Sequence, residues 1–158
     1  MKRIISMSVF IAISFFSSAQ TDTAKTKLKP YASLGISIGH VDPNDSTINN
    51  FGKASYPSVE FGVMGKNLSL GAVFGCENMF VNSSSRGFYE LKTSVSVPVG
   101  KCSAYALFGV GAYFEKHFNN FLEYGAGFSY MPGRFGYFVQ YSNWARTNYI
   151  STGFTVGF

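Results

Sequence analysis

From residue 30 to the end of the chain, apolar residues alternate with small or polar residues in a period of two. In the first such segment, Leu34, Ile36 and Ile38 are separated by glycine or serine. This period is typical of a β-strand whose two faces meet different surroundings, and it does not fit a helix. Eight segments show it, and each has about the ten residues that a tilted strand needs to cross a bilayer. The pattern therefore predicts an all-β chain.

The two faces of these segments differ enough to indicate which of them meets water. One face carries aliphatic and aromatic side chains, and the other is mostly glycine and serine. Charged residues make up 13% of the sequence, against about 25% in soluble domains. A soluble eight-stranded barrel would expose the glycine and serine face, which has too few charges for an ordinary soluble surface. We therefore expect the apolar face to contact lipid and the polar face to line a lumen.

A sheet in lipid must leave no strand edge unpaired. The predicted fold over residues 30–158 is therefore an eight-stranded antiparallel up-and-down transmembrane β-barrel. Short turns at residues 65–67, 99–101 and 132–134 alternate with longer polar connections, which we expect at residues 41–55, 78–87, 116–121 and 143–148. Short periplasmic turns and longer outer loops are typical of outer-membrane barrels, so both mature termini are expected in the periplasm.

The N-terminus has the features of an export signal. A basic pair, Lys2 and Arg3, precedes an apolar run that ends in small residues at Ala19. The run is shorter than the roughly 20 apolar residues that a membrane-spanning helix needs. We therefore expect residues 1–19 to be a signal peptide, and the polar, lysine-rich residues 20–29 to be a flexible periplasmic lead-in.

Aromatic residues gather near the predicted strand ends, where outer-membrane barrels carry interfacial girdles. Those near the turns are Tyr31, Tyr105, Tyr130, Phe135 and Phe158, and those near the longer loops are Phe80, Tyr89, Phe114, Tyr124, Trp144 and Tyr149. The sequence ends in alternating apolar residues with phenylalanine last, from Phe154 to Phe158. Together with the architecture, this ending resembles the small OmpA/OmpX-like outer-membrane barrels of Gram-negative bacteria.

The resemblance covers residues 30–158 and depends on the architecture and on the terminal Phe158. It implies a monomer in the outer membrane, in contact with outer-membrane lipid, whose terminal signal is recognised by the barrel-assembly machinery during biogenesis. Members of this family include structural proteins, adhesion or resistance proteins, narrow pores and a few lipid-modifying enzymes. The resemblance thus implies the fold more strongly than the role.

Acidic residues on the predicted lumen face form the candidate functional site. Four of them fall near the outer ends of consecutive strands, and an acid and a lysine lie deeper in the barrel. The predicted lumen charge cluster is Glu60, Glu77, Glu90, Lys92, Glu115 and Glu123. Counter-ions are expected from Lys92 itself and from Arg86, Lys116 and Arg146. Such a cluster is either a salt-bridge network that stiffens the barrel, or a divalent-cation site or cation-preferring vestibule.

One segment has a weak similarity to an enzyme. Gln140-Tyr141-Ser142-Asn143, followed by Asn148, resembles the His-x-Ser-Asn…Asn stretch of outer-membrane lipid A deacylases. The histidine position is occupied by Gln140, and no glutamate follows Glu123, so Ser142 lacks a base to activate it. We therefore expect no catalytic residues.

Other kinds of site are not indicated by the sequence. Metal-ligand spacing and a nucleic-acid-binding basic patch are both lacking, so neither metal nor cofactor is expected. Cys76 and Cys102 should lie about 20 Å apart in height along their strands, too far for a disulfide.

The predicted lumen is rich in glycine, which leaves space for water, but Met64, Tyr113, Phe138 and the Glu60–Lys92 region are placed to obstruct it. We expect discontinuous lumen water and no more than a small conductance. The favoured function is a non-enzymatic structural or surface-interaction role, and the alternative is a narrow pore for small solutes or cations.

Overall fold

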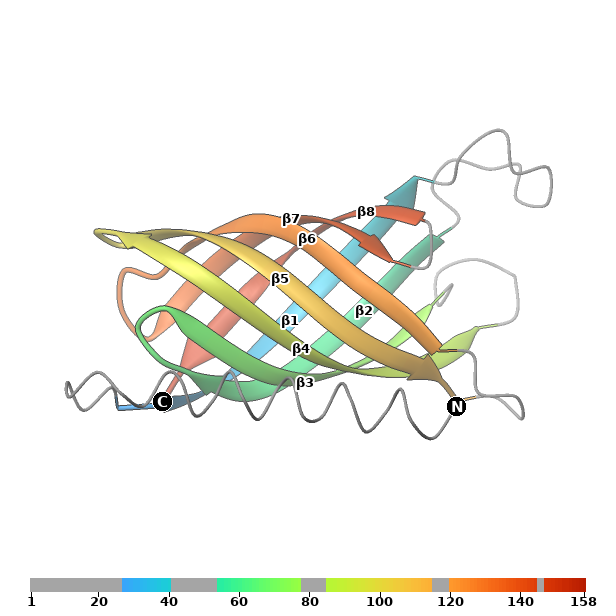
Figure 1. The fold of residues 1–158 in the computed structure, drawn as a ribbon, viewed down its shortest axis with the longest axis horizontal. Coiled ribbons are helices and arrows are strands. Elements are labelled where there is room, and N and C mark those ends of the chain that lie inside the picture. The colour runs from blue at the N-terminus through green and yellow to red at the C-terminus, as the bar shows by residue number, and fades with distance from the viewer. Residues whose placement is uncertain (1–26, 41–53, 78–84, 115–119, 145–146) are drawn as a thin grey trace.

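The computed structural model describes residues 27–40, 54–77, 85–114, 120–144 and 147–158. These residues form eight antiparallel strands in one closed barrel, in which each strand pairs with its neighbours in the sequence (Figure 1). The strands are β1 (Lys29–His40), β2 (Ala54–Met64), β3 (Leu68–Glu77), β4 (Arg86–Val99), β5 (Cys102–Tyr113), β6 (Asn120–Tyr130), β7 (Phe135–Trp144) and β8 (Thr147–Gly157). The predicted eight-stranded antiparallel barrel is confirmed. Among the described residues, none forms a helix long and apolar enough to span a bilayer.

The first and last strands close the barrel. β1 pairs with β8 from Tyr31↔Gly157 to His40↔Asn148. One residue beyond β8, the Phe158 amide still donates a hydrogen bond to the Pro30 carbonyl, at 2.9 Å. Because β1 and β8 pair along their length, the sheet has no free edge, as a sheet in lipid requires.

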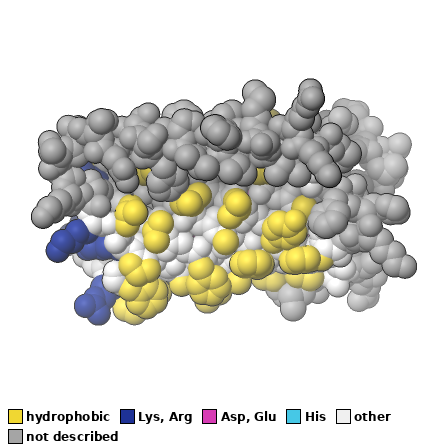
Figure 2. All heavy atoms as spheres, turned by 60° about the horizontal axis from the view of Figure 1, so that its bottom comes forward, with side chains coloured by type: hydrophobic (Ala, Val, Ile, Leu, Met, Phe, Trp, Pro, Cys, Tyr) yellow, Lys and Arg dark blue, Asp and Glu magenta, His cyan; other side chains and the backbone are white. Residues whose placement is uncertain are grey.

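Side chains alternate between the two surfaces of the sheet as the sequence predicts. On β6, Leu122, Tyr124 and Phe128 are exposed on the outside, whereas Phe121 and Glu123 are buried inside. The other strands add to the same apolar outer surface (Figure 2). Its large members include Leu34, Phe61, Leu91, Val95, Phe108, Val139, Ile150 and Phe154. A surface of this composition matches the lipid-facing band of a transmembrane barrel.

The strands extend further into the predicted loops than the sequence analysis expected. The expected connection at residues 143–148 is wrong, because Asn143 pairs with Asn148 and Trp144 with Thr147. β4 already begins at Arg86 and β6 at Asn120, so the connections at residues 78–87 and 116–121 are also shorter than predicted. The composition of these strand ends is polar, as in loops, yet they continue the ladder, and two of them carry the buried aromatic residues Phe121 and Trp144.

Other boundaries agree or lie outside the described residues. β2 begins at Ala54, one residue before the end of the predicted connection at residues 41–55. Residues 41–53 of that connection lie outside the described residues. The predicted signal peptide and most of the predicted lead-in also fall outside, and β1 begins at Lys29, one residue before the predicted barrel.

The predicted aromatic girdles are partly wrong. Tyr31, Tyr105, Trp144 and Tyr149 point into the lumen, where they are buried or half-buried. Their strands alternate, and each of these residues shares the inward face of a serine two positions away: Ser33, Ser103, Ser142 and Ser151. The girdle residues that do lie exposed on the outside are Tyr89, Phe114, Tyr124, Tyr130, Phe135 and Phe158, while Phe80 is outside the described residues.

A close approach between β6 and β7 gives a first testable prediction. Gly125 pairs with Ser142, and a Cβ on Gly125 would overlap the Tyr141 carbonyl oxygen and lie 2.6 Å from the Ser142 Cα. Gly125→Ala should therefore push the strands apart and lower the free energy of unfolding by about 1–3 kcal/mol. Gly133→Ala is the matched control, because nothing lies within 4 Å of its Cβ. Urea unfolding of the reconstituted protein, followed by circular dichroism, measures both, and equal midpoints would contradict the prediction.

Candidate functional site

The lumen contains three layers along the barrel axis. We call the end that carries residues 65–67, 100–101 and 131–134 the turn end, and the opposite end the loop end. An aromatic cluster fills the lumen near the loop end, a charged layer lies below it, and a cavity occupies the turn end. The candidate functional site is the charged layer together with the structures that close it on either side.

Seven buried side chains close the lumen near the loop end, and each comes from a different strand, from β2 to β8. This aromatic plug consists of Tyr56, Val73, Phe88, Tyr113, Phe121, Trp144 and Tyr149. Trp144 is at its centre: its ring stacks on Tyr113 with centroids 5.9 Å apart, and it meets Tyr56 edge-on at 4.7 Å. Edge-on and offset ring pairs of this kind are favourable beyond the area they bury. The plug therefore ties seven strands together across the barrel interior.

A salt bridge lies beside the plug. Arg86 is 3.3 Å from a carboxylate oxygen of Glu77, and its guanidinium carbon lies 4.9 Å from the centre of the Tyr113 ring. The Tyr149 hydroxyl donates a hydrogen bond to the other oxygen of Glu77, at 3.1 Å. Glu77 is thus neutralised locally, beside the plug and apart from the charged layer.

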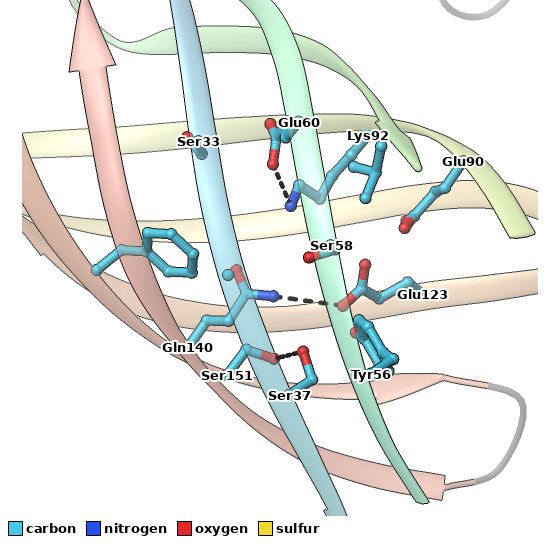
Figure 3. Close-up of a pocket in the computed structure, with 13 residues that line it drawn as sticks. Ser33, Ser37, Tyr56, Ser58, Glu60, Glu90, Lys92, Glu123, Gln140 and Ser151 are labelled. Carbon is cyan, nitrogen blue, oxygen red and sulfur yellow. Dashed lines mark hydrogen bonds and ion pairs between the residues drawn. The ribbon is translucent and has the colours of Figure 1, made fainter. Parts of the chain in front are cut away.

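The charged layer contains a buried ion pair. Lys92 Nζ lies 2.5 Å from Glu60 Oε2, with both side chains less than 15% exposed. The Tyr31 hydroxyl donates a hydrogen bond to the second oxygen of Glu60. Figure 3 shows the two charged side chains pointing toward each other inside the barrel. The pair joins β2 to β4 across the intervening β3.

Two further acids approach each other across β5. Gly109 pairs with Lys92 on one side and with Glu123 on the other, and the carboxylate of Glu90 occupies the place that a Gly109 side chain would fill. The glycine thus allows Glu90 and Glu123, from β4 and β6, to come together (Figure 3). Glu123 accepts a hydrogen bond from Gln140 Nε2 at 3.5 Å. Glu90 Oε1 is buried without a hydrogen-bond partner among the described residues.

Two cavities flank the ion pair. The smaller has a volume of about 20 Å³, lies inside the charged layer, and has room for about one water molecule. The larger, about 220 Å³, lies at the turn end, and hydroxyl groups dominate its polar lining. We call the larger one the vestibule. Its hydroxyl-bearing residues are Tyr31, Ser33, Ser69, Ser94, Ser96, Ser103, Tyr105, Ser129 and Thr155.

The partition between the cavities is built from a few side chains. Ser33, Glu60, Lys92, Phe138 and Gln140 line both cavities, so they form the wall that separates the vestibule from the charged layer. Passage along the lumen would require the Glu60–Lys92 pair to open, and after that the aromatic plug to loosen.

The structure brings together four of the six residues of the predicted charge cluster. Glu60, Glu90, Lys92 and Glu123 all line the small cavity of the charged layer. Glu77 lies apart with Arg86, and Glu115 falls outside the described residues, as do the proposed counter-ions Lys116 and Arg146.

Tyr31 and Tyr105 as polar partners, and most of the plug, were not predicted from the sequence. The Tyr105 hydroxyl donates to Gln140 Oε1 at 3.4 Å, which links it to the charged layer. The alternation of the strands does indicate that Tyr31 and Phe88 face the lumen, because Tyr31 lies on the same face as Ser33, and Phe88 on the same face as Glu90. Of the residues expected to obstruct the lumen, Tyr113 belongs to the plug, Glu60 and Lys92 form the buried ion pair, and Met64 and Phe138 line the vestibule.

In the enzyme-like segment, Gln140 and Ser142 face the barrel interior, whereas Tyr141 is exposed on the outside. Ser142 is completely buried, and its hydroxyl has no hydrogen-bond partner among the described residues. Asn143 Nδ2 donates to Asn148 Oδ1 at 2.8 Å, which joins β7 to β8. In the described part of the chain no three His, Cys, Asp or Glu side chains are grouped to hold a metal ion, and Cys76 and Cys102 are free thiols.

Comparison with known proteins places this architecture. No family model and no curated protein matches the sequence. Among solved structures, a de novo designed transmembrane β-barrel matches with a TM-score of 0.56 and 16% identity, over 82% of this chain and 95% of the designed chain. Neisserial surface protein A (NspA) matches with a TM-score of 0.52 and 14% identity, over 83% of this chain and 97% of that one. The chain thus has the fold of a small transmembrane β-barrel.

Proposed function

We propose that this chain is a monomeric outer-membrane β-barrel protein with a non-enzymatic structural or surface-interaction role. The aromatic plug is the observation that carries the proposal, because one buried side chain from each of β2 to β8 fills the lumen near the loop end. Eight-stranded barrels are narrow enough to be filled in this way. A filled lumen supports a role on the surface of the barrel rather than passage through it.

The outer surface and the ends of the strands support the proposed location. The exposed apolar band fits lipid, and the short turns at one end fit the periplasmic side of an outer-membrane barrel. In this proposal both mature termini are periplasmic, the chain belongs to the OmpA/OmpX-like group, and the terminal Phe158, which is exposed, is recognised by the barrel-assembly machinery.

The burial of Ser142 supports the non-enzymatic part of the proposal. A lipid hydrolase must present its nucleophile to lipid with a base beside it. Ser142 instead points into the barrel, and its neighbour on the same face, Gln140, is engaged with Glu123 and Tyr105.

The alternative function is a narrow pore for small solutes or cations, and the vestibule favours it. About 220 Å³ of space at the turn end leads to a layer with three carboxylates and one lysine. Conduction would require both the Glu60–Lys92 pair and the aromatic plug to move. A measurement of conductance therefore distinguishes this alternative from the favoured role.

Planar-bilayer recording tests the favoured role. We expect folded, reconstituted protein to show no stable single-channel steps, because the plug and the Glu60–Lys92 pair close the lumen in series. Glu60→Gln should leave the recordings unchanged, since it does not alter the plug. A heat-dependent shift in gel mobility confirms that each sample is folded. Stable cation-selective steps that change in Glu60→Gln would overturn the favoured role and establish the pore.

A further inference from the structure

The charged side chains that the structure describes are divided between the lumen and one end of the barrel. All four described acids, Glu60, Glu77, Glu90 and Glu123, are buried or half-buried inside. Two of the seven described Lys and Arg residues, Arg86 and Lys92, form ion pairs with Glu77 and Glu60. The other five are exposed and lie at the turn end; we call them the basic rim. It consists of Lys27, Lys29, Lys66, Lys101 and Arg134.

The basic rim follows the circumference of the barrel. Each of the three short turns supplies one cation: Lys66 between β2 and β3, Lys101 between β4 and β5, and Arg134 between β6 and β7. Lys27 and Lys29 lie at the start of β1. The cations are therefore distributed around the barrel instead of converging on one point, which favours a ring of ligands over a single solute.

The rim also borders the apolar outer surface. Lys101 lies two residues after Val99 and Arg134 directly before Phe135, and these two apolar side chains are 71% and 70% exposed. Figure 2 shows Lys and Arg side chains at the end of the apolar surface, with no acidic side chain on this face. In a barrel surrounded by lipid, cations at the edge of the apolar band lie at the height of the headgroups, where their long side chains can reach phosphate.

We propose that the basic rim binds the phosphate groups of anionic phospholipids in the leaflet that surrounds the turn end. The circumferential arrangement, the contact with the apolar band and the absence of an exposed acidic side chain among the described residues at this end all match a ring of anionic headgroups. The inference rests on the proposed membrane location of the barrel, but it adds a lipid preference that a membrane location alone does not require.

Spin-labelled lipids measure this preference. The protein is reconstituted in vesicles of equal parts phosphatidylcholine and phosphatidylglycerol, and the immobilised fraction of each labelled lipid gives their relative association constants. We expect phosphatidylglycerol to be favoured by about fivefold at each cation, and the preference to fall in high salt, which screens exposed charges. Equal association of the two lipids with the unmodified protein would overturn the proposal and leave the rim for a soluble anionic partner.

Paired variants assign the effect to the rim. The triple variant K66Q/K101Q/R134Q should lose most of the preference, whereas K66R/K101R/R134K keeps the charges and should keep it. The three positions are exposed in turns, so the variants should fold, and the gel-mobility shift checks this. A preference that persists in the neutral variant contradicts the rim proposal alone. Failure of the unmodified protein to insert into vesicles would instead contradict the proposed membrane function.

Discussion

Replacing Lys92 by methionine is expected to destabilise the barrel by about 3–5 kcal/mol, the usual cost of removing one partner from a buried ion pair. Lys92 is the one cation that the described residues place in the charged layer, where it lies 2.5 Å from Glu60. Without it, Glu60, Glu90 and Glu123 line the same small cavity with no positive charge among the described residues. Urea unfolding of vesicle-reconstituted protein, followed by circular dichroism, gives the change.

A double variant separates the loss of the pair from the loss of side-chain packing. Glu60→Gln removes one carboxylate but can keep the hydrogen bond from the Tyr31 hydroxyl. The double variant Glu60→Gln/Lys92→Met should therefore lose less stability than the sum of the two single variants, because neither partner is left buried and uncompensated. Additive losses would show that the two side chains act independently, and unchanged stability in Lys92→Met would contradict the prediction outright.

Phe108→Arg is expected to cost about 2–4 kcal/mol, the range for arginine on the lipid face near the middle of a bilayer. Phe108 is on the outer face of β5, between Thr93 of β4 and Tyr124 of β6, and 48% of its surface is exposed. The charge of the introduced arginine would have to lie in lipid, or the side chain would have to extend to the membrane–water interface and disturb the local structure. The same urea titration measures the effect.

Ser94→Arg is the matched control on the opposite face. Ser94 lines the vestibule, which has a volume of about 220 Å³ and is also lined by Glu60. An arginine there has space and an acidic neighbour, so we expect a smaller loss than in Phe108→Arg. Equal losses in the two variants would contradict the assignment of the faces, and so would tolerance of arginine at position 108.

The local pattern of the sequence was sufficient to predict the barrel. The period of two assigns each strand residue to a face, and the apolar composition of one face directs it outward, so Phe108 and Ser94 could be placed without a structure. The ends of the strands were harder to predict. Asn143 and Asn148 are typical of loops by composition, but in the barrel they pair across β7 and β8, and the ladder continues to Trp144.

The charged layer depends on strand register, which local sequence does not encode. Glu60 is level with Val73 on β3 and thus with Glu90 on β4, whereas Lys92 is level with Gly71 and Gly62, two residues away. Glu60 reaches Lys92 because Gly71, between them, has no side chain in its path. The sequence indicated which residues face the lumen, but this pairing required the stagger of three strands and the position of one glycine.

The plug was missed for a related reason. Aromatic residues near strand ends fit an interfacial girdle as well as a filled lumen, and the sequence analysis placed Trp144 and Tyr149 in the girdle. Two residues earlier on the same strand, Ser142 is buried, so strict alternation assigns Trp144 to the lumen. Only the arrangement of seven strands around one centre shows that these rings meet.

The origin of the plug in seven strands has a consequence for how the protein acquires its native state. Contacts between residues as far apart as Tyr56 and Tyr149 cannot form until the intervening hairpins are assembled, so the interior must order late, together with the pairing of β1 and β8. The chain has one tryptophan, and it lies at the centre of this cluster. The fluorescence emission of this tryptophan therefore reports closure of the barrel. A hairpin that had only adsorbed to a bilayer would not surround the tryptophan with the other rings of the plug, so its emission would differ from that of the native state.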